Sequence, residues 1–114
     1  MKKPKIIDHP LYQLIRDENI TEFNNRKANG EQCDMTLCDF KGLDLRGIDA
    51  DGLDWSDSYF RGADLRGVDL RNTNLQGASF AGAKLSGTYF PDKLSAAEIS
   101  MSIQHGTRLR YSKD

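Results

Sequence analysis

Valine and glutamate are almost missing from this chain of 114 residues. Val68 is the only valine, and four glutamates stand against thirteen aspartates. Regular sheets favour valine and helices favour glutamate, so neither ordinary class of domain explains the composition. Leu, Ile, Val and Phe together supply only 25 residues, close to the range of disordered chains. The chain therefore needs a fold that works with few large apolar side chains.

Long apolar runs are also missing, which excludes a membrane-spanning helix. The first residues, MKKPKII, have a basic head, but no apolar stretch of signal-peptide length follows them. We therefore expect a cytoplasmic protein that does not contact membranes. The two cysteines, Cys33 and Cys38, fit a reducing compartment.

The chain has no excess of either charge and no cluster of catalytic residue types. Sixteen Lys and Arg balance seventeen Asp and Glu, which argues against direct binding of nucleic acid. The two histidines, His9 and His105, lie in opposite flanks, and the glycines are not gathered into a phosphate-binding loop. The sequence thus predicts a protein that is not an enzyme and has no catalytic residues, no cofactor and no small-molecule ligand.

A five-residue repeat fills the middle of the chain. Twelve pentads cover residues 33–92 without an insertion: CDMTL CDFKG LDLRG IDADG LDWSD SYFRG ADLRG VDLRN TNLQG ASFAG AKLSG TYFPD. The central column is large and mostly apolar, and the column two residues earlier is mostly small. Eight glycines share one column and seven aspartates another. Such regularity indicates a repeat architecture.

A period of five fits neither a helix nor a flat strand. A helix would spread these side chains over every face, and a strand would turn the apolar columns over at each repeat. A short extended piece followed by a bend places both apolar columns inward. Glycine permits the bend, and Asp or Asn beside it bonds local backbone more readily than the longer Glu.

The runs LDLRG at residues 43–47 and ADLRG at residues 63–67 resemble those of the pentapeptide-repeat proteins. This resemblance implies an all-β solenoid core, a right-handed quadrilateral β-helix with four pentads per coil and about three coils. Residues twenty apart would then stack about 4.8 Å apart. One face would carry Phe40, Phe60 and Phe80 in register.

A coil this short needs both ends covered, because open ends expose apolar side chains and unpaired backbone. We expect an N-terminal helical cap over residues 1–32, the repeat over 33–92, and a capping helix with a basic tail over 93–114. Residues 9–29 suggest two short helices, with Pro10 in the first turn and either Asn19 or Thr21 capping the second. Ser95 and Glu98 form the pattern of a capping box before a helix that Gly106 ends. For the tail after Gly106 the sequence leaves two alternatives, a partial strand or disorder.

A metal site is not expected. Asp49, Asp51 and Gly52 look like part of an acidic calcium loop, but the EF-hand pattern needs Glu where this chain has Phe60. Cys33 and Cys38 stand in the small inward column on adjacent faces, which favours a packing role over metal binding.

The outward columns supply the candidate interaction surface. Lys41 should stack over Arg61, Arg46 over Arg66, and Asp44 over Asp64, giving alternating basic and acidic stripes. Two aromatic residues replace Asp in its column and would either anchor a partner or lie against a cap. The candidate surface residues are Lys41, Asp44, Arg46, Tyr59, Arg61, Asp64, Arg66 and Tyr89. The candidate dimer or cap helix carries Ile99, Met101 and Ile103.

These features favour a non-catalytic protein–protein interaction module with an unidentified protein partner. The resemblance implies an alternative, a DNA-mimicking modulator or protector of a type II topoisomerase such as gyrase. The repeats hold ten acids and six bases, but Arg46, Arg66 and Arg71 interrupt the acidic face. Three coils would match one turn of DNA only as an end-to-end dimer. A homodimer through the C-terminal helix is compatible with either reading.

Overall fold

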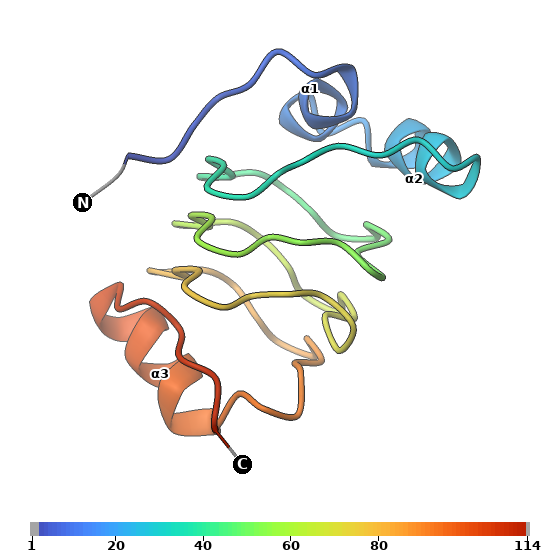
Figure 1. Ribbon diagram of the computed structural model, residues 1–114. Coiled ribbons are helices and arrows are strands. Elements are labelled where there is room, and N and C mark those ends of the chain that lie inside the picture. Colours follow the sequence, from blue (N-terminus) through green and yellow to red (C-terminus); the bar gives the residue numbers. More distant parts are fainter. Residues whose placement is uncertain (1–2, 114) are drawn as a thin grey trace.

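The computed structural model describes residues 3–113, in which a stack of coils lies between helices (Figure 1). The described helices are α1 (Pro10–Arg16), α2 (Ile20–Ala28) and α3 (Ala96–His105). Helices α1 and α2 lie at one end of the stack and α3 lies at the other (Figure 1). Two helices within residues 9–29 and one after Ser95 were predicted from the sequence, and these predictions are confirmed.

The repeat winds with twenty residues per turn. Parallel bridges join residues twenty apart, as between Asp44 and Asp64 and between Asp64 and Lys84. The coil length expected from the resemblance is therefore observed. The expected all-β core is met only in part, because the described residues pair through isolated bridges and not through continuous strands. Each extended piece ends at a bend after a few residues, too soon to form a longer ladder.

The bends use left-handed backbone. The eight repeat glycines have φ between 63° and 81°, a region that residues with a side chain avoid. Leu37 and Asp57 occupy the same column without being glycine, at φ 54° and 60°. Ten of the twelve positions of this column therefore share the left-handed conformation, and Asn72 and Asp92 are the two that do not.

The interior is a stack of rings in the predicted register. Phe40, Phe60 and Phe80 are fully buried, with successive ring centroids 4.9 Å apart and interplanar angles of 7° and 15°. Trp55 is also fully buried, and its indole N–H has no hydrogen-bond acceptor among the described residues. The narrow coil therefore buries large side chains with few residues, which explains the low apolar content.

The N-terminal residues take the place of a preceding coil. Lys5 donates its N–H to Leu37 O at 2.7 Å and accepts from Asp39 N at 2.9 Å. Tyr12 of α1 packs edge-on against Phe40, with ring centroids 5.5 Å apart. Asn19, the first of the two predicted alternatives, caps α2 by accepting from Glu22 N.

Helix α2 and the turn before it complete this cover of the first coil. The Glu18 carboxylate accepts from Asp44 N, and the Asn24 side chain accepts from Asp49 N at 2.8 Å. Side chains here do what backbone carbonyls of another coil would do.

Helix α3 and the tail cover part of the opposite end. Ser95 caps α3 as predicted, accepting from Glu98 N at 3.2 Å, and Gly106 ends it at φ 69°. The second half of the predicted capping box, in which the Glu98 side chain returns to Ser95 N, is wrong. The Glu98 carboxylate instead pairs with Arg110 at 3.0 Å. Residues 107–113 form no strand, and Leu109 is fixed to the last coil because it accepts from Gly77 N and donates to Ala78 O. The division of the chain at residues 32 and 92 stays a prediction.

Candidate interaction surface

The outward-facing aspartates close their own turns. In each case Oδ1 accepts the backbone N–H two residues later, at 2.8–3.2 Å. The residues that do this are Asp34, Asp39, Asp44, Asp49, Asp54, Asp64, Asp69 and Asn74. The local role that the sequence predicts for Asp and Asn is thus confirmed.

Three of these aspartates also hold the arginine two residues later by two hydrogen bonds. The pairs are Asp44–Arg46, Asp64–Arg66 and Asp69–Arg71, with Nη2 to Oδ2 distances of 2.7, 2.7 and 2.8 Å. The hydrogen bonds from Arg66 and Arg71 lower the pKa values of Asp64 and Asp69 to about 2. These carboxylates are therefore charged, but their oxygens already accept hydrogen bonds from arginines of the same chain.

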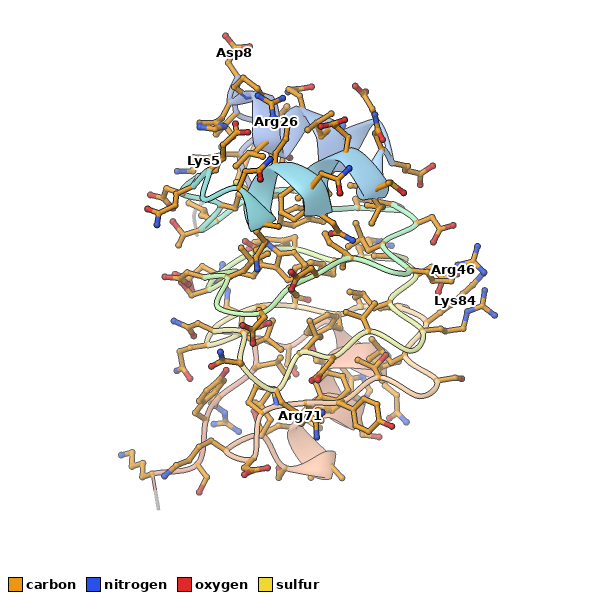
Figure 2. All side chains as sticks on the ribbon, turned by 90° about the vertical axis from the view of Figure 1, so that its right-hand side faces the viewer. Lys5, Asp8, Arg26, Arg46, Arg71 and Lys84 are labelled. Carbon is orange, nitrogen blue, oxygen red and sulfur yellow. The ribbon has the colours of Figure 1, made fainter. Side chains whose placement is uncertain are left out.

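The pairs on one side of the stack join into an arginine ladder made of Asp44, Arg46, Asp64 and Arg66. Arg46 Nε lies 3.5 Å from Asp64 Oδ2, so that it links one coil to the next. Figure 2 shows Arg46 and Lys84 projecting from the same side of the stack. The stripes predicted from the sequence stack as expected, but their charges largely compensate one another.

Lys41 and Arg61 differ from the arginine ladder. They lie in adjacent coils, where Gly42 N donates to Arg61 O at 2.8 Å, and neither forms an ion pair with a described residue. Arg61 lines a groove of about 690 Å³ between residues 59–62, residues 79–82 and the end of α3. We call this the Arg61 groove. Arg61 and His105 line this groove, and no Asp or Glu side chain of the described residues does. The groove therefore favours a negatively charged ligand.

Apolar and aromatic groups share the Arg61 groove with Arg61. Tyr59 and Ala81 line it from the coil, and Ile103 lines it from α3. Tyr59 is half-buried, because Arg108 lies 5.4 Å from its ring centroid and donates to its hydroxyl. Of the two alternatives for this tyrosine, contact with a cap is the one observed.

The remaining predicted residues lie away from the Arg61 groove. Tyr89 is 56% exposed, with the Arg71 guanidinium 4.8 Å from its ring centroid. On α3, Ile99 packs against the core and Met101 is 45% exposed. Of the predicted set, Tyr59, Arg61 and Ile103 line the Arg61 groove.

The family model for pentapeptide repeats matches residues 54–90, in eight copies. The chain carries pentapeptide repeats. Comparisons with curated proteins and with solved structures gave no match. Residues 33–53 precede the matched segment and have the same left-handed bends at Gly42, Gly47 and Gly52. The pentapeptide-repeat geometry thus begins before the segment that the family model recognises.

Residues outside the pentapeptide repeat supply contacts that the sequence did not reveal. Ser102 is fully buried in α3, and its Oγ accepts from Phe80 N at 2.9 Å and donates to Thr107 O at 2.6 Å. Arg108 covers Tyr59, and the Tyr111 hydroxyl accepts from Leu75 N at 2.9 Å. The tail has a basic composition but no period, and nothing in its sequence specifies these partners.

The two cysteines and His9 of the pentapeptide-repeat chain have structural roles. Burial raises the pKa of Cys38 to about 11 and also raises that of Cys33, so both thiols are poor nucleophiles near neutral pH. His9 caps α1 by accepting from Leu11 N at 3.1 Å. Within residues 3–113, no group of three or more His, Cys, Asp or Glu side chains is placed to hold a metal ion. None of the described helices has the length and apolar character needed to cross a membrane.

Proposed function

We propose that this chain is a non-catalytic protein–protein interaction module that binds an acidic protein surface through the Arg61 groove. The coil is taken to be the right-handed quadrilateral β-helix typical of pentapeptide repeats. One observation carries the proposal: Lys41 and Arg61 have no ion-pair partner among the described residues, whereas the other repeat arginines are held by aspartates. Arg61 lines the groove and Lys41 lies in the adjacent coil, and unpaired cations of this kind favour a partner of opposite charge.

The groove also offers what an anchor needs besides charge. Tyr59 is held in place by Arg108, and Ile103 adds an apolar wall. Aromatic and apolar groups of fixed position bind at a small entropic cost, and the surrounding cations set orientation and rate. A rigid coil is a suitable support, because its backbone positions repeat from turn to turn.

No observation favours the DNA-mimicking alternative over this one. A mimic of DNA presents unpaired acids along its length, but the carboxylates of Asp44, Asp64 and Asp69 are paired with arginines. In the last coil the aspartate column holds Asn74, Ser79, Lys84 and Tyr89, so the acidic column ends there. Gyrase remains a partner to be tested.

The test is capture of partners from a lysate of the source organism with three forms of the tagged protein. We expect the wild type and the Lys113→Glu control to retain the same proteins, and the Lys41→Glu/Arg61→Glu variant to lose them. Retention should also fall as salt rises, because screening weakens exposed charges. Circular dichroism confirms that all three forms fold.

Identical sets of proteins retained by all three forms would contradict the groove as the contact site. A supercoiling assay with gyrase supplies the second measurement. Inhibition or protection of gyrase that survives the Lys41→Glu/Arg61→Glu change would support the DNA-mimicking alternative instead.

A further inference from the structure

Backbone hydrogen bonds join each coil to the next, and a pentad with the complete set uses three backbone groups. The complete set is present in residues 38–42, 53–57, 58–62 and 63–67. In residues 63–67 these are Ala63 C=O, Leu65 N–H and Gly67 N–H. Lys84 N donates to Ala63 O at 2.9 Å, and Leu65 N donates to Lys84 O at 2.9 Å. Gly67 N donates to Ser86 O at 3.0 Å. One residue of the following coil therefore satisfies two groups, and the residue two positions later satisfies the third.

In the last coil the C-terminal segment satisfies such groups on two sides. On one side Phe80 N donates to Ser102 Oγ at 2.9 Å and Gly82 N to Ile103 O at 2.9 Å. The adjoining side uses the tail, where Leu75 N donates to the Tyr111 hydroxyl and Gly77 N to Leu109 O. The helix and the tail thus replace a further coil at these pentads.

The pentad at residues 83–87 has no such cover. Among residues 3–113, no hydrogen bond reaches Ala83 C=O, Leu85 N–H or Gly87 N–H. These are the same three groups that join residues 63–67 to the coil below them. We call them the 83–87 edge. Natural proteins usually protect edges of this kind, because an unpaired row of donors and acceptors recruits another chain.

We propose that the 83–87 edge binds an extended, acidic segment of another protein by β-strand addition. One residue of the segment donates to Ala83 O and accepts from Leu85 N–H, and the carbonyl two residues later accepts from Gly87 N–H. This repeats the arrangement that Lys84 and Ser86 make with the coil above. Main-chain hydrogen bonds supply affinity in this mode, and neighbouring side chains supply specificity.

Lys84 determines the charge of the segment. It occupies the column that holds Asp44 and Asp64 in the coils above, is exposed, and forms no ion pair with a described residue. Figure 2 shows Lys84 and Arg46 projecting from the same side of the stack. Two copies joined antiparallel by this edge would bring two Lys84 side chains together, whereas an acidic segment would meet opposite charge.

The proposal does not depend on the Arg61 groove, and its first test needs no partner. Hydrogen exchange followed by NMR compares each edge amide with its equivalent one coil earlier. We expect the amides of Leu85 and Gly87 to exchange at least about 100-fold faster than those of Leu65 and Gly67. Equally slow exchange at both levels would show that the edge is covered, and would overturn the proposal.

The second test uses the peptide Glu-Val-Glu-Val-Glu-Val-Glu as an extended acidic probe. At saturation it should slow exchange of the Leu85 and Gly87 amides by about tenfold or more, and its Lys-Val counterpart should not. The Lys84→Glu variant should reverse this preference. The Arg61→Glu variant should behave as wild type, which separates the edge from the groove.

A third peptide, with the acidic sequence and alternate backbone nitrogens N-methylated, lacks the donors and carries the same charge. When the methylated face of this peptide lies against the 83–87 edge, it cannot form the hydrogen bonds of a strand. We then expect the amides of Leu85 and Gly87 to exchange as fast as in the free protein. Protection as strong as that from the unmethylated peptide, or equal protection by the acidic and basic peptides, would refute strand addition.

Discussion

Seven of the ten aspartates of the repeat are engaged in their own turns before any partner binds. The carboxylate reaches the N–H two residues later at about the distance of an ordinary hydrogen bond, as between Asp54 and Ser56 at 3.0 Å. Glutamate, one methylene longer, makes this local contact less readily. Seven of the thirteen aspartates thus serve turn geometry, which accounts for most of their excess over the four glutamates.

Replacing Asp64 with Asn separates the turn from the charge. Asn keeps an acceptor for the turn, as Asn74 does for Gln76 N, but loses the ion pairs with Arg46 and Arg66. The Arg66 hydrogen bond lowers the folded-state pKa of Asp64 to about 2, below the value of about 3.9 for an unfolded chain. The charged form therefore stabilises the fold above about pH 4, and that contribution is lost as pH falls to about 2.

We accordingly expect Asp64→Asn to lower the thermal midpoint at pH 7 and to match the wild type near pH 2. Circular dichroism melts at both pH values measure this. Asp8→Asn is the control, since Asp8 is exposed and forms no ion pair with a described residue. A difference between Asp64→Asn and wild type that is the same at both pH values would contradict the electrostatic explanation.

Trp55 gives a second prediction at this scale. Its buried indole N–H lacks an acceptor among the described residues, which costs about 1–3 kcal/mol. Trp55→Phe removes that cost but leaves a smaller ring, so the two effects oppose each other. We expect the free energy of unfolding to change by less than about 1.5 kcal/mol, against a loss of about 3–5 kcal/mol for Phe60→Ala. Urea denaturation measures both; a loss for Trp55→Phe as large as for Phe60→Ala would show that the N–H is satisfied in solution.

At the scale of elements, the caps work by supplying hydrogen bonds in the register of a missing coil. Lys5 does this with its backbone at the first coil, and Leu109 does it at the last. Where no backbone is in reach, side chains replace it, as Asn24 does for Asp49 N and Ser102 for Phe80 N. A cap of this kind stabilises one end of the repeat and also determines which edge stays open.

Ser102→Ala tests the cap at its most buried contact. The change leaves Phe80 N–H and Thr107 C=O without their partner, and a buried group left unpaired costs about 1–3 kcal/mol. We expect a loss of that size in urea denaturation, together with faster hydrogen exchange at Phe80. Ser100→Ala on the exposed side of α3 is the matched control and should change stability by less than about 0.5 kcal/mol. Equal effects of the two substitutions would mean that α3 does not depend on this hydrogen bond.

The sequence predicts the coil far better than it predicts the surface. The pentad columns decide which side chains point inward, and the family resemblance adds four pentads per coil. Together they predict the stack of Phe40, Phe60 and Phe80. The same columns place Arg46 over Arg66, but they do not say that each guanidinium turns back to its own aspartate. That choice depends on the geometry of the turn, and it is what distinguishes the arginine ladder from the unpaired Arg61.

The caps were predictable as helices and not as contacts. Pro10, Ser95 and Gly106 carry local signals for where a helix begins or ends, and the structure has helices there. Ser102 and Arg108 carry no such signal, because their roles arise only from the fold of a non-repeating segment against the last coil. The Arg61 groove exists only where α3 packs beside the coils, so the sequence predicted three of its residues, Tyr59, Arg61 and Ile103, but not the groove itself.

Across the whole molecule, charge changes along the stack. The first coil, residues 33–52, holds five acids and two bases, and the second holds four acids and three bases. The third, residues 73–92, holds one of each, and a tail with several bases follows it. Both proposed contact sites lie toward this less acidic end, where an acidic partner meets less repulsion.

The exposed apolar residues bear on whether the protein associates with itself. Ile6, at 61% exposure, precedes α1, and Met101, at 45%, lies on α3 at the opposite end of the stack (Figure 1). Ile99 and Ile103, the other predicted dimer residues, are half-buried beside the last coil. A stable dimer usually buries about 1,200–2,000 Å² with an apolar centre. One methionine on α3 falls short of that.

We therefore predict a monomer of 12.8 kDa in light scattering at micromolar concentration, with the same mass for Met101→Glu. Met101→Glu is informative because it places a charge at the centre of any α3–α3 contact without removing a core side chain. A species of twice the mass that Met101→Glu dissociates would instead establish the homodimer through α3. It would also restore the end-to-end dimer that a DNA mimic of this length requires, so the same measurement decides whether the topoisomerase alternative keeps its structural basis.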